Sequence, residues 1–216
     1  MKRLTEVAIQ RCRAGVFTRA EVALWLQGSA DAETAIIKRA LASGEVIRVC
    51  RGIYCLAPQY RERPLDAFAL AERILGPSYV SLESALAHHG WLPEAVEMVT
   101  SVCDLRSREF RTPVGVFRFS RVPQEQLFAG VSREIRPEGQ VAFLASPLKA
   151  LADYVFVHHL EWRGREPLIE SLRIPADLVE TIDPAACAAL ASNYRSKRVK
   201  RFLKGLSREA TACRSQ

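Results

Sequence analysis

The hydrophobic period of the first 57 residues changes once, and this change constrains the fold more than any other feature of the sequence. Residues 4–13, 19–26 and 29–43 carry apolar side chains at helical spacing, so each segment predicts an amphipathic helix. Residues 46–49 and 53–56 are instead short β-rich runs, which predict the two strands of a hairpin. Helices followed by a hairpin in this order are typical of a winged helix-turn-helix domain.

The ends of these elements carry residues that suit helix starts and turns. Thr18 and Glu21 have the spacing of a capping box, which predicts the start of the second helix. Gly15 and Gly44 follow helical segments and are expected to end them. Gly52 lies between the two β-rich runs and can adopt the positive φ that a tight hairpin turn requires.

The polar side chains of this module are placed where a winged helix contacts DNA. In that fold the third helix enters the major groove and reads base edges, while the hairpin lies along the phosphate backbone. Long cations on the hairpin and near the first turn would neutralise phosphates. A solvated helix face, or a module that binds protein, remains the alternative. The candidate DNA-contacting residues are Arg19, Gln27, Thr34, Lys38, Arg39, Arg48 and Arg51.

The net charge of +7 on 216 residues is divided unevenly along the chain. Residues 1–57 and residues 147–216 each carry an excess of four basic side chains, whereas residues 58–146 are close to neutral. Basic ends on a compact protein indicate a nucleic-acid partner. The 49% of hydrophobic residues exclude a disordered chain, and no apolar run reaches the roughly 20 residues of a membrane span. We therefore expect a cytoplasmic protein without a membrane partner.

A Pro-containing, charged segment at residues 57–64 predicts a linker between two domains. Residues 1–57 form the winged helix-turn-helix domain in this interpretation, and residues 65–216 form a larger domain. In the larger domain, helical segments precede short strands with turns at 113–115 and 137–139, and further helices follow. The predicted fold class is α+β, with a short antiparallel sheet and a helical C-terminal part.

Six of the ten residues from 195 to 204 are basic and none is acidic. Val199, Phe202 and Leu203 are interleaved at helical spacing, so the segment predicts a helix that docks by an apolar stripe and presents its charge outward. DNA, RNA or an acidic protein are all candidate partners, and a solvated terminal helix is the alternative. As candidate DNA contacts we take Arg195, Lys197, Arg198, Lys200, Arg201 and Lys204.

Four motifs occur in order along the chain: RGIY at 51–54, GPSYVSLESAL at 76–86, VTS at 99–101 and SPLKALAD at 146–153. Together they resemble the AbiE-type (abortive infection) antitoxin family and related winged-helix transcriptional regulators. The resemblance covers roughly residues 3–160, and the helical C-terminal part is less distinctive.

The resemblance implies a non-enzymatic regulator that binds inverted repeats in its own operon's promoter and represses it. It also implies a type IV antitoxin whose second domain counteracts a nucleotidyltransferase-like toxin encoded by the neighbouring gene. We expect two copies on the DNA, as a homodimer or through cooperative binding. Stand-alone regulators and protein-interaction modules share the layout, so a role without a toxin stays open.

Other chemistry is weakly indicated. Adjacent histidines at 88–89 and 158–159 point about 100° apart on a helix, and no ligand cluster completes a metal site. Asp104, Glu109 and Arg111 faintly match a metal-dependent nuclease, although the basic position of such a site is usually lysine. The six cysteines are irregularly spaced and are expected to be reduced. No cofactor, metal or catalytic residue is predicted.

Overall fold

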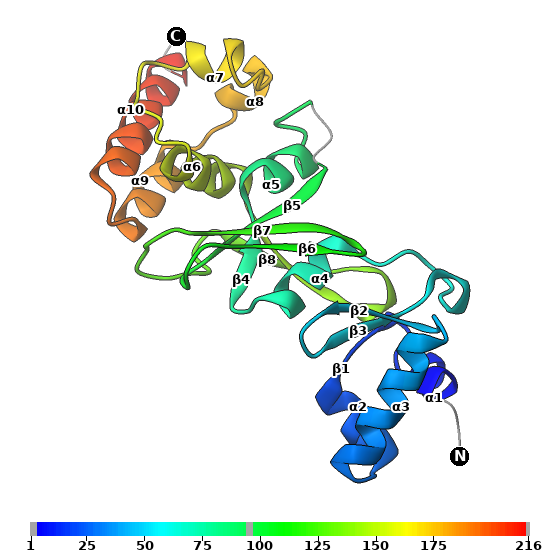
Figure 1. The fold of residues 1–216 in the computed structure, drawn as a ribbon. Coiled ribbons are helices and arrows are strands. Elements are labelled where there is room, and N and C mark those ends of the chain that lie inside the picture. The colour runs from blue at the N-terminus through cyan, green and yellow to red at the C-terminus, as the bar shows by residue number, and fades with distance from the viewer. Residues whose placement is uncertain (1–3, 94–96, 215–216) are drawn as a thin grey trace.

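A computed structural model of the protein describes residues 4–93 and 97–214 (Figure 1). The helices are α1 (Leu4–Arg11), α2 (Arg19–Leu26), α3 (Ala30–Ala42), α4 (Ala67–Ile74), α5 (Leu82–His88), α6 (Pro147–Val157), α7 (Glu166–Glu170), α8 (Ala176–Glu180), α9 (Pro184–Asn193) and α10 (Lys197–Arg214). The strands are β1 (Val16–Thr18), β2 (Val46–Cys50), β3 (Ile53–Leu56), β4 (Ser78–Val80), β5 (Met98–Cys103), β6 (Arg108–Thr112), β7 (Gly115–Arg121), β8 (Val131–Ile135) and β9 (Val141–Ala145). The predicted α+β class is confirmed.

The winged helix-turn-helix order of the first 57 residues is also confirmed, with one addition. The predicted capping box forms, since the Glu21 amide donates to Thr18 Oγ1 at 3.2 Å and the Thr18 amide donates to Glu21 Oε2 at 2.6 Å. Gly52 has a φ of 81° in the β2–β3 turn. Strand β1 was not predicted, because three residues are too few to show alternation. It pairs with β3, so the module has a three-stranded sheet in the order β1-β3-β2.

This small sheet is buried on both faces. Phe17, Tyr54 and Leu56 pack with the buried side of α3 on one face. The side chains that alternate with them on β1 and β3 point to the other face, where Ile53 and Cys55 share a core with α4. The whole of β3 is therefore buried, although it is the second strand of the wing.

The winged helix module thus packs directly against the rest of the chain. Besides the shared core, Arg73 Nη2 of α4 lies 2.8 Å from Glu21 Oε2 of α2. The connecting residues 58–64 are mostly exposed and contain a short 3₁₀ turn, Pro58–Tyr60. The division into domains at 1–57 and 65–216 stays a prediction. Hydrophobic contacts join the two predicted domains.

The larger sheet has six strands in the order β6-β7-β5-β4-β9-β8. The expected antiparallel pairing holds for β6–β7, β4–β5 and β8–β9, but β5–β7 and β4–β9 pair in parallel. The sheet is therefore mixed, with the predicted antiparallel pairing in three strand pairs and parallel pairing in the other two. Alternation within a strand reports which side chains are buried, but it does not report the direction of the neighbouring strand.

Helices cover both faces of this sheet. Helices α5 and α6 lie above it in Figure 1 and α4 lies below it, between the sheet and the winged helix module. The C-terminal helices form a further layer in which α10 packs against α9 and α6. The predicted breaks at 173–175 and 183–184 separate α7, α8 and α9. Within the described residues, no helix is both long and apolar enough to cross a bilayer.

A fully buried ion pair lies where α6 meets the sheet. Lys149 and Asp153 are one turn apart on α6, both 0% exposed, with Nζ and Oδ1 3.0 Å apart. Burial lowers the pKa of Lys149, and the neighbouring carboxylate acts in the opposite direction. The lysine also donates to the Tyr194 hydroxyl at 2.8 Å and to Gln124 Oε1.

The carboxylate of Asp153 accepts hydrogen bonds from three hydroxyl groups. Tyr79 and Ser81 each donate to Oδ2 at 2.8 Å, and Tyr194 donates to Oδ1 at 2.6 Å. Burial, and next the negative charge of Asp153, raise the pKa of Tyr79 and of Tyr194 well above the usual value. Gln124 closes the network by donating to the Tyr79 hydroxyl at 2.9 Å. This set of five buried or partly buried partners around Lys149 is called the Lys149 network below.

We predict that Asp153→Ala destabilises the protein by about 3–5 kcal/mol, because it leaves the Lys149 ammonium buried without its counter-charge. The free energy of unfolding from urea titration measures the loss. Asp104→Ala is the control, since Asp104 is exposed, and it should change stability by less than about 0.5 kcal/mol. A loss below about 1 kcal/mol for Asp153→Ala would show that the pair is not needed.

Candidate DNA interface

The solvent-exposed face of helix α3 is formed mostly by small side chains and carries two cations. The Ser29 side chain accepts a hydrogen bond from the Ala32 amide and begins the helix. The opposite face buries Ile36, Ile37 and Ala40 in the module's core. The exposed face consists largely of alanines, with Asp31 in its first turn and Lys38 and Arg39 as its long side chains. Small side chains let a helix approach base edges closely, so this face suits a major groove.

Arg19 joins the third helix to the wing. Its backbone amide donates to the Gly52 carbonyl at the wing turn, at 2.9 Å. Its guanidinium Nη2 donates to Thr34 Oγ1 of α3 at 2.8 Å, and the Thr34 hydroxyl in turn donates to the Ala30 carbonyl at 2.7 Å. The Thr34 hydroxyl is thus occupied on both sides. In this arrangement Thr34 positions the exposed cation of Arg19, a role that sequence spacing did not indicate.

The remaining predicted residues of the module are exposed at its tips. Gln27 lies in the α2–α3 turn with a φ of 49°, and its amide donates to the Ala23 carbonyl. Arg48 Nε lies 3.4 Å from the Cys50 carbonyl, so this side chain bends toward the wing turn. Within the described residues no ion pair is formed by Lys38 or Arg51. Their charges are available to an external partner.

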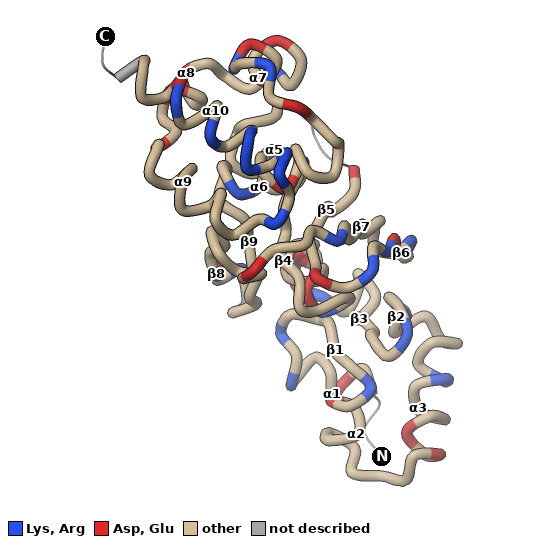
Figure 2. Tube along the Cα trace, turned by 90° about the vertical axis from the view of Figure 1, so that its left-hand side faces the viewer, with Lys and Arg blue, Asp and Glu red and all other residues tan. Residues whose placement is uncertain are grey.

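The predicted basic tail lies far from this module. Figure 2 shows Lys and Arg along α10 at one end of the molecule and on α3 and β2 at the other. Within the tail, Arg195 is engaged by Glu125, with Nε and Oε1 2.9 Å apart, and Arg201 lies 3.7 Å from Glu161. The structure therefore does not bring the two predicted sets of cations together into one surface.

The tail otherwise docks as predicted. Val199 and Leu203 are fully buried and Phe202 is 2% exposed. Lys197 and Lys204 are exposed, whereas Arg198 and Lys200 are half-buried. Arg198 has a buried Nε, so it contributes less to the outward surface than the sequence pattern indicated.

The histidine pairs make contacts within the protein. His89 Nε2 lies 2.9 Å from the Ala145 carbonyl, and His158 Nε2 lies 2.8 Å from Glu83 Oε1. His88 lies 3.9 Å from Glu134. Among the described residues, no group of three or more His, Cys, Asp or Glu side chains could hold a metal ion.

Of the residues weighed for a nuclease, Glu109 and Arg111 lie on the edge strand β6, whereas Asp104 follows β5. Glu109 is held by Arg111 at 2.9 Å and by Arg118 at 2.8 Å, and these hydrogen bonds, first that of Arg118, lower the pKa of Glu109. Asp104 is exposed. Cys12, Cys50, Cys55, Cys103 and Cys187 are free, and the last three of these are buried. Burial raises the pKa of Cys187 to about 11.

The winged helix module is similar to a known protein family. Residues 6–57 match the family model described as "Transcriptional regulator, AbiEi antitoxin". The match spans the winged helix module, from α1 to the end of β3, and leaves the rest of the chain unmatched. No curated protein matches the chain. The resemblance to AbiE-type antitoxins is confirmed over this module.

We predict that Thr34→Val and Arg19→Ala act on DNA binding through one contact. Each change should weaken binding to duplex DNA, Thr34→Val by about twofold to fivefold, since an exposed polar contact has a modest effect. In the double variant the Thr34 change should add nothing further, because its hydroxyl acts through Arg19. Gel-shift titration of the four proteins measures the coupling. Independent, multiplying effects would mean that Thr34 contacts DNA itself.

Proposed function

We propose that this chain, whose first module matches AbiEi antitoxin transcriptional regulators, is a DNA-binding regulator that represses its own promoter. One observation carries the proposal: the family match falls on the module whose α3 and wing present exposed cations. Lys38 and Arg39 lie on the helix that such modules insert into the major groove. Arg48 and Arg51 lie on the wing, beside the phosphate backbone in the same docking.

When the module is docked in this way, some of its cations contact base edges and others contact phosphates. Lys38 and Arg39 are the exposed cations on this helix surface of mostly small side chains, so we assign base edges to them, with Arg39 released from the Ala35 carbonyl that its Nε contacts at 3.3 Å. Arg19 and Arg51 flank that helix and contact phosphates, and Gln27 at the α2–α3 turn adds a further backbone contact. Phosphate contacts fix the position of the protein, and base contacts select the sequence.

The winged helix module is held in one orientation on the rest of the protein. Because α2 is joined to α4 by Glu21 and Arg73 and because the small sheet shares a core with α4, the module's orientation is tied to the rest of the protein. Two copies, as a homodimer or bound cooperatively, then place two α3 helices on the inverted repeats of a promoter in the cytoplasm.

The second part of the chain is assigned the antitoxin activity, which counteracts a nucleotidyltransferase-like toxin from the adjacent gene. The family match supports an antitoxin role in general terms. Tyr79, Ser81, Lys149 and Asp153 belong to the motifs that carry the resemblance, yet all four are buried. They stabilise the fold and do not contact a toxin, so the antitoxin surface consists of other, exposed residues.

We predict that Lys38→Ala and Arg51→Ala weaken DNA binding in different ways. Arg51→Ala should weaken binding to all sequences similarly and reduce the salt slope by about 0.9, because one phosphate contact is lost. Lys38→Ala should weaken binding to the chain's own upstream region by about fivefold to a hundredfold more than binding to random DNA. Gel-shift titrations at several salt concentrations measure both effects.

The control for this pair is Arg133→Ala, which removes an exposed cation on β8 and should leave both affinities unchanged. Equal affinity of the wild-type protein for upstream and random duplexes would overturn the proposal of a specific regulator. If the salt slope falls for Lys38→Ala and not for Arg51→Ala, then Lys38 contacts a phosphate and Arg51 does not.

We predict that co-expression of this protein restores growth to cells in which the product of the adjacent gene arrests it. Rescue should persist in Lys38→Ala and Arg51→Ala, because the toxin is counteracted by residues outside the winged helix module. Colony counts with and without induction measure the rescue. Failure of the wild-type protein to rescue growth would assign the chain to stand-alone regulators.

A further inference from the structure

Helix α10 is held in one orientation by its apolar side. Val199, Phe202, Leu203, Leu206 and Ala210 are between 0% and 7% exposed, so this stripe is the docked face of the helix. The orientation is reinforced at its centre, where the Trp162 indole fills the space that a side chain at Gly205 would take. The ring of Trp162 also contacts Phe202 edge to face, at 5.2 Å between centroids.

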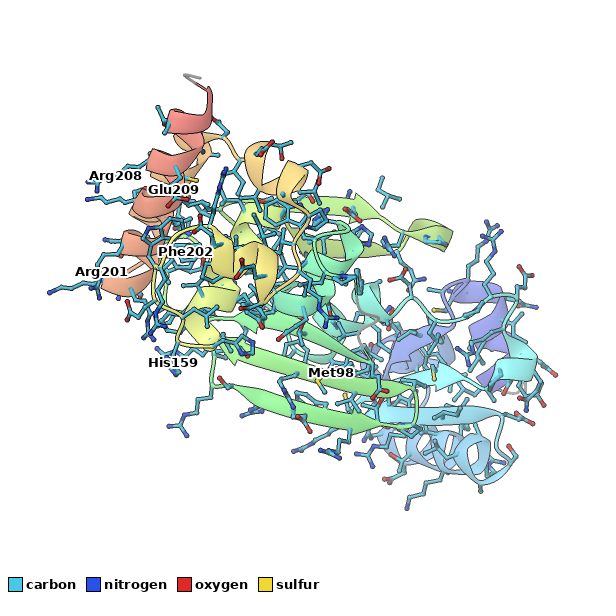
Figure 3. The ribbon with its side chains drawn as sticks, turned by 90° about the horizontal axis from the view of Figure 1, so that it is seen from above. Met98, His159, Arg201, Phe202, Arg208 and Glu209 are labelled. Atoms are coloured by element: carbon cyan, nitrogen blue, oxygen red, sulfur yellow. The ribbon has the colours of Figure 1, made fainter. Side chains whose placement is uncertain are left out.

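The opposite side of α10 carries a straight row of exposed cations, Lys197, Arg201, Lys204 and Arg208, called here the cationic stripe. Their spacing of four, three and four residues places them one above another along about 16 Å of helix. In Figure 3, Arg201 and Arg208 point away from the molecule, whereas Phe202 points into it.

The charges of this stripe are largely uncompensated. Arg201 has Glu161 at 3.7 Å, and both side chains are more than half exposed. Among the described residues, Lys197, Lys204 and Arg208 form no ion pair. Like charges one turn apart destabilise a helix, so the fold does not account for this row.

The stripe presents positive charge, but it has no exposed aromatic side chain that could stack on bases or anchor a protein partner. Single-stranded nucleic acids are bound by stacking bases on aromatic side chains, but the aromatic residue of α10, Phe202, is buried. Protein partners are usually anchored by Trp, Tyr or Arg side chains in well-packed pockets, and the stripe has no exposed aromatic side chain beside its two arginines. A straight row of flexible cations instead suits the backbone of a double helix, which carries one charge about every 1.7 Å of its axis.

The stripe and the winged helix lie at opposite ends of the molecule (Figure 1). A duplex docked on α3 and the wing therefore approaches the end of the protein far from α10. We propose that the cationic stripe binds the backbone of a second segment of double-stranded DNA, so that one copy of the protein bridges two segments. This inference rests on the proposed function for the first contact and adds a second, sequence-independent one.

A capture experiment with the full chain tests the bridge. Beads carry the chain's own upstream duplex, the protein is bound to them, and a fluorescent random-sequence duplex of 30 base pairs is then added as the probe. Wild-type protein should retain the probe, and added salt should release it. The stripe variant should retain about tenfold less probe while binding the bead duplex within about twofold of wild type. The stripe variant combines Lys197→Ala, Arg201→Ala, Lys204→Ala and Arg208→Ala.

A matched control removes four exposed cations elsewhere and should retain the probe as wild type does; it combines Arg106→Ala, Arg108→Ala, Arg121→Ala and Arg133→Ala. A variant with Lys197→Ala and Lys204→Ala alone should lose an intermediate amount of probe. This pair keeps the experiment informative if the fourfold variant folds poorly.

Several results would overturn the bridge. Undiminished capture by the stripe variant would assign bridging to a protein dimer or to another surface. Retention of an RNA hairpin of equal length in place of the DNA probe would assign the stripe to RNA. If the wild-type protein does not bind the upstream duplex, the proposed function fails by itself. The stripe is then tested by direct titration of the random duplex, and equal affinity of the wild type and the stripe variant would overturn it.

Discussion

The body of this protein depends on a lysine and an aspartate that share one turn of α6 and never meet solvent. Charged groups are buried only when their partners are nearly complete, because the loss of hydration costs several kcal/mol per ion. Lys149 and Asp153 meet this condition with Tyr79 of β4, Ser81 at the start of α5 and Tyr194 before α10. The network therefore fixes how the central sheet, α6 and the C-terminal helices meet, and small shifts of any one element would leave a charge unpaired.

A second, smaller junction sets the direction in which the DNA-binding module faces. Glu21 accepts hydrogen bonds from Thr18 at the start of α2 and also holds Arg73 of α4. One carboxylate thus begins a helix and joins two parts of the chain. Since Arg19, the next residue after the cap, contacts both the wing turn and α3, the geometry of the cap extends to the proposed DNA contacts.

The net charge of the chain becomes informative only when it is placed on the fold. Exposed cations of the N-terminal end lie on α3 and the wing, where Asp31 and Glu33 of α3 offset part of the charge, and the excess at the C-terminal end lies on α10, with the sheet between them (Figure 2). Part of the second excess is neutralised locally, as Arg195 is by Glu125. What remains is a row on one helix face. If both surfaces bind DNA, the near-neutral body acts as a spacer that holds two duplexes apart.

The sequence by itself determined the local elements of this protein and the family of its first module. Capping at Thr18, the apolar face of α3 and the turn at Gly52 depend on neighbours a few residues away, so they can be inferred from spacing. Only the tertiary structure decided the contacts between distant residues. The parallel pairings of the sheet, the tie between Arg19 and Thr34, and the bond from Lys149 to Tyr194 join residues 15 to 45 or more positions apart. Such pairs leave no periodic signal, because packing in three dimensions selects them.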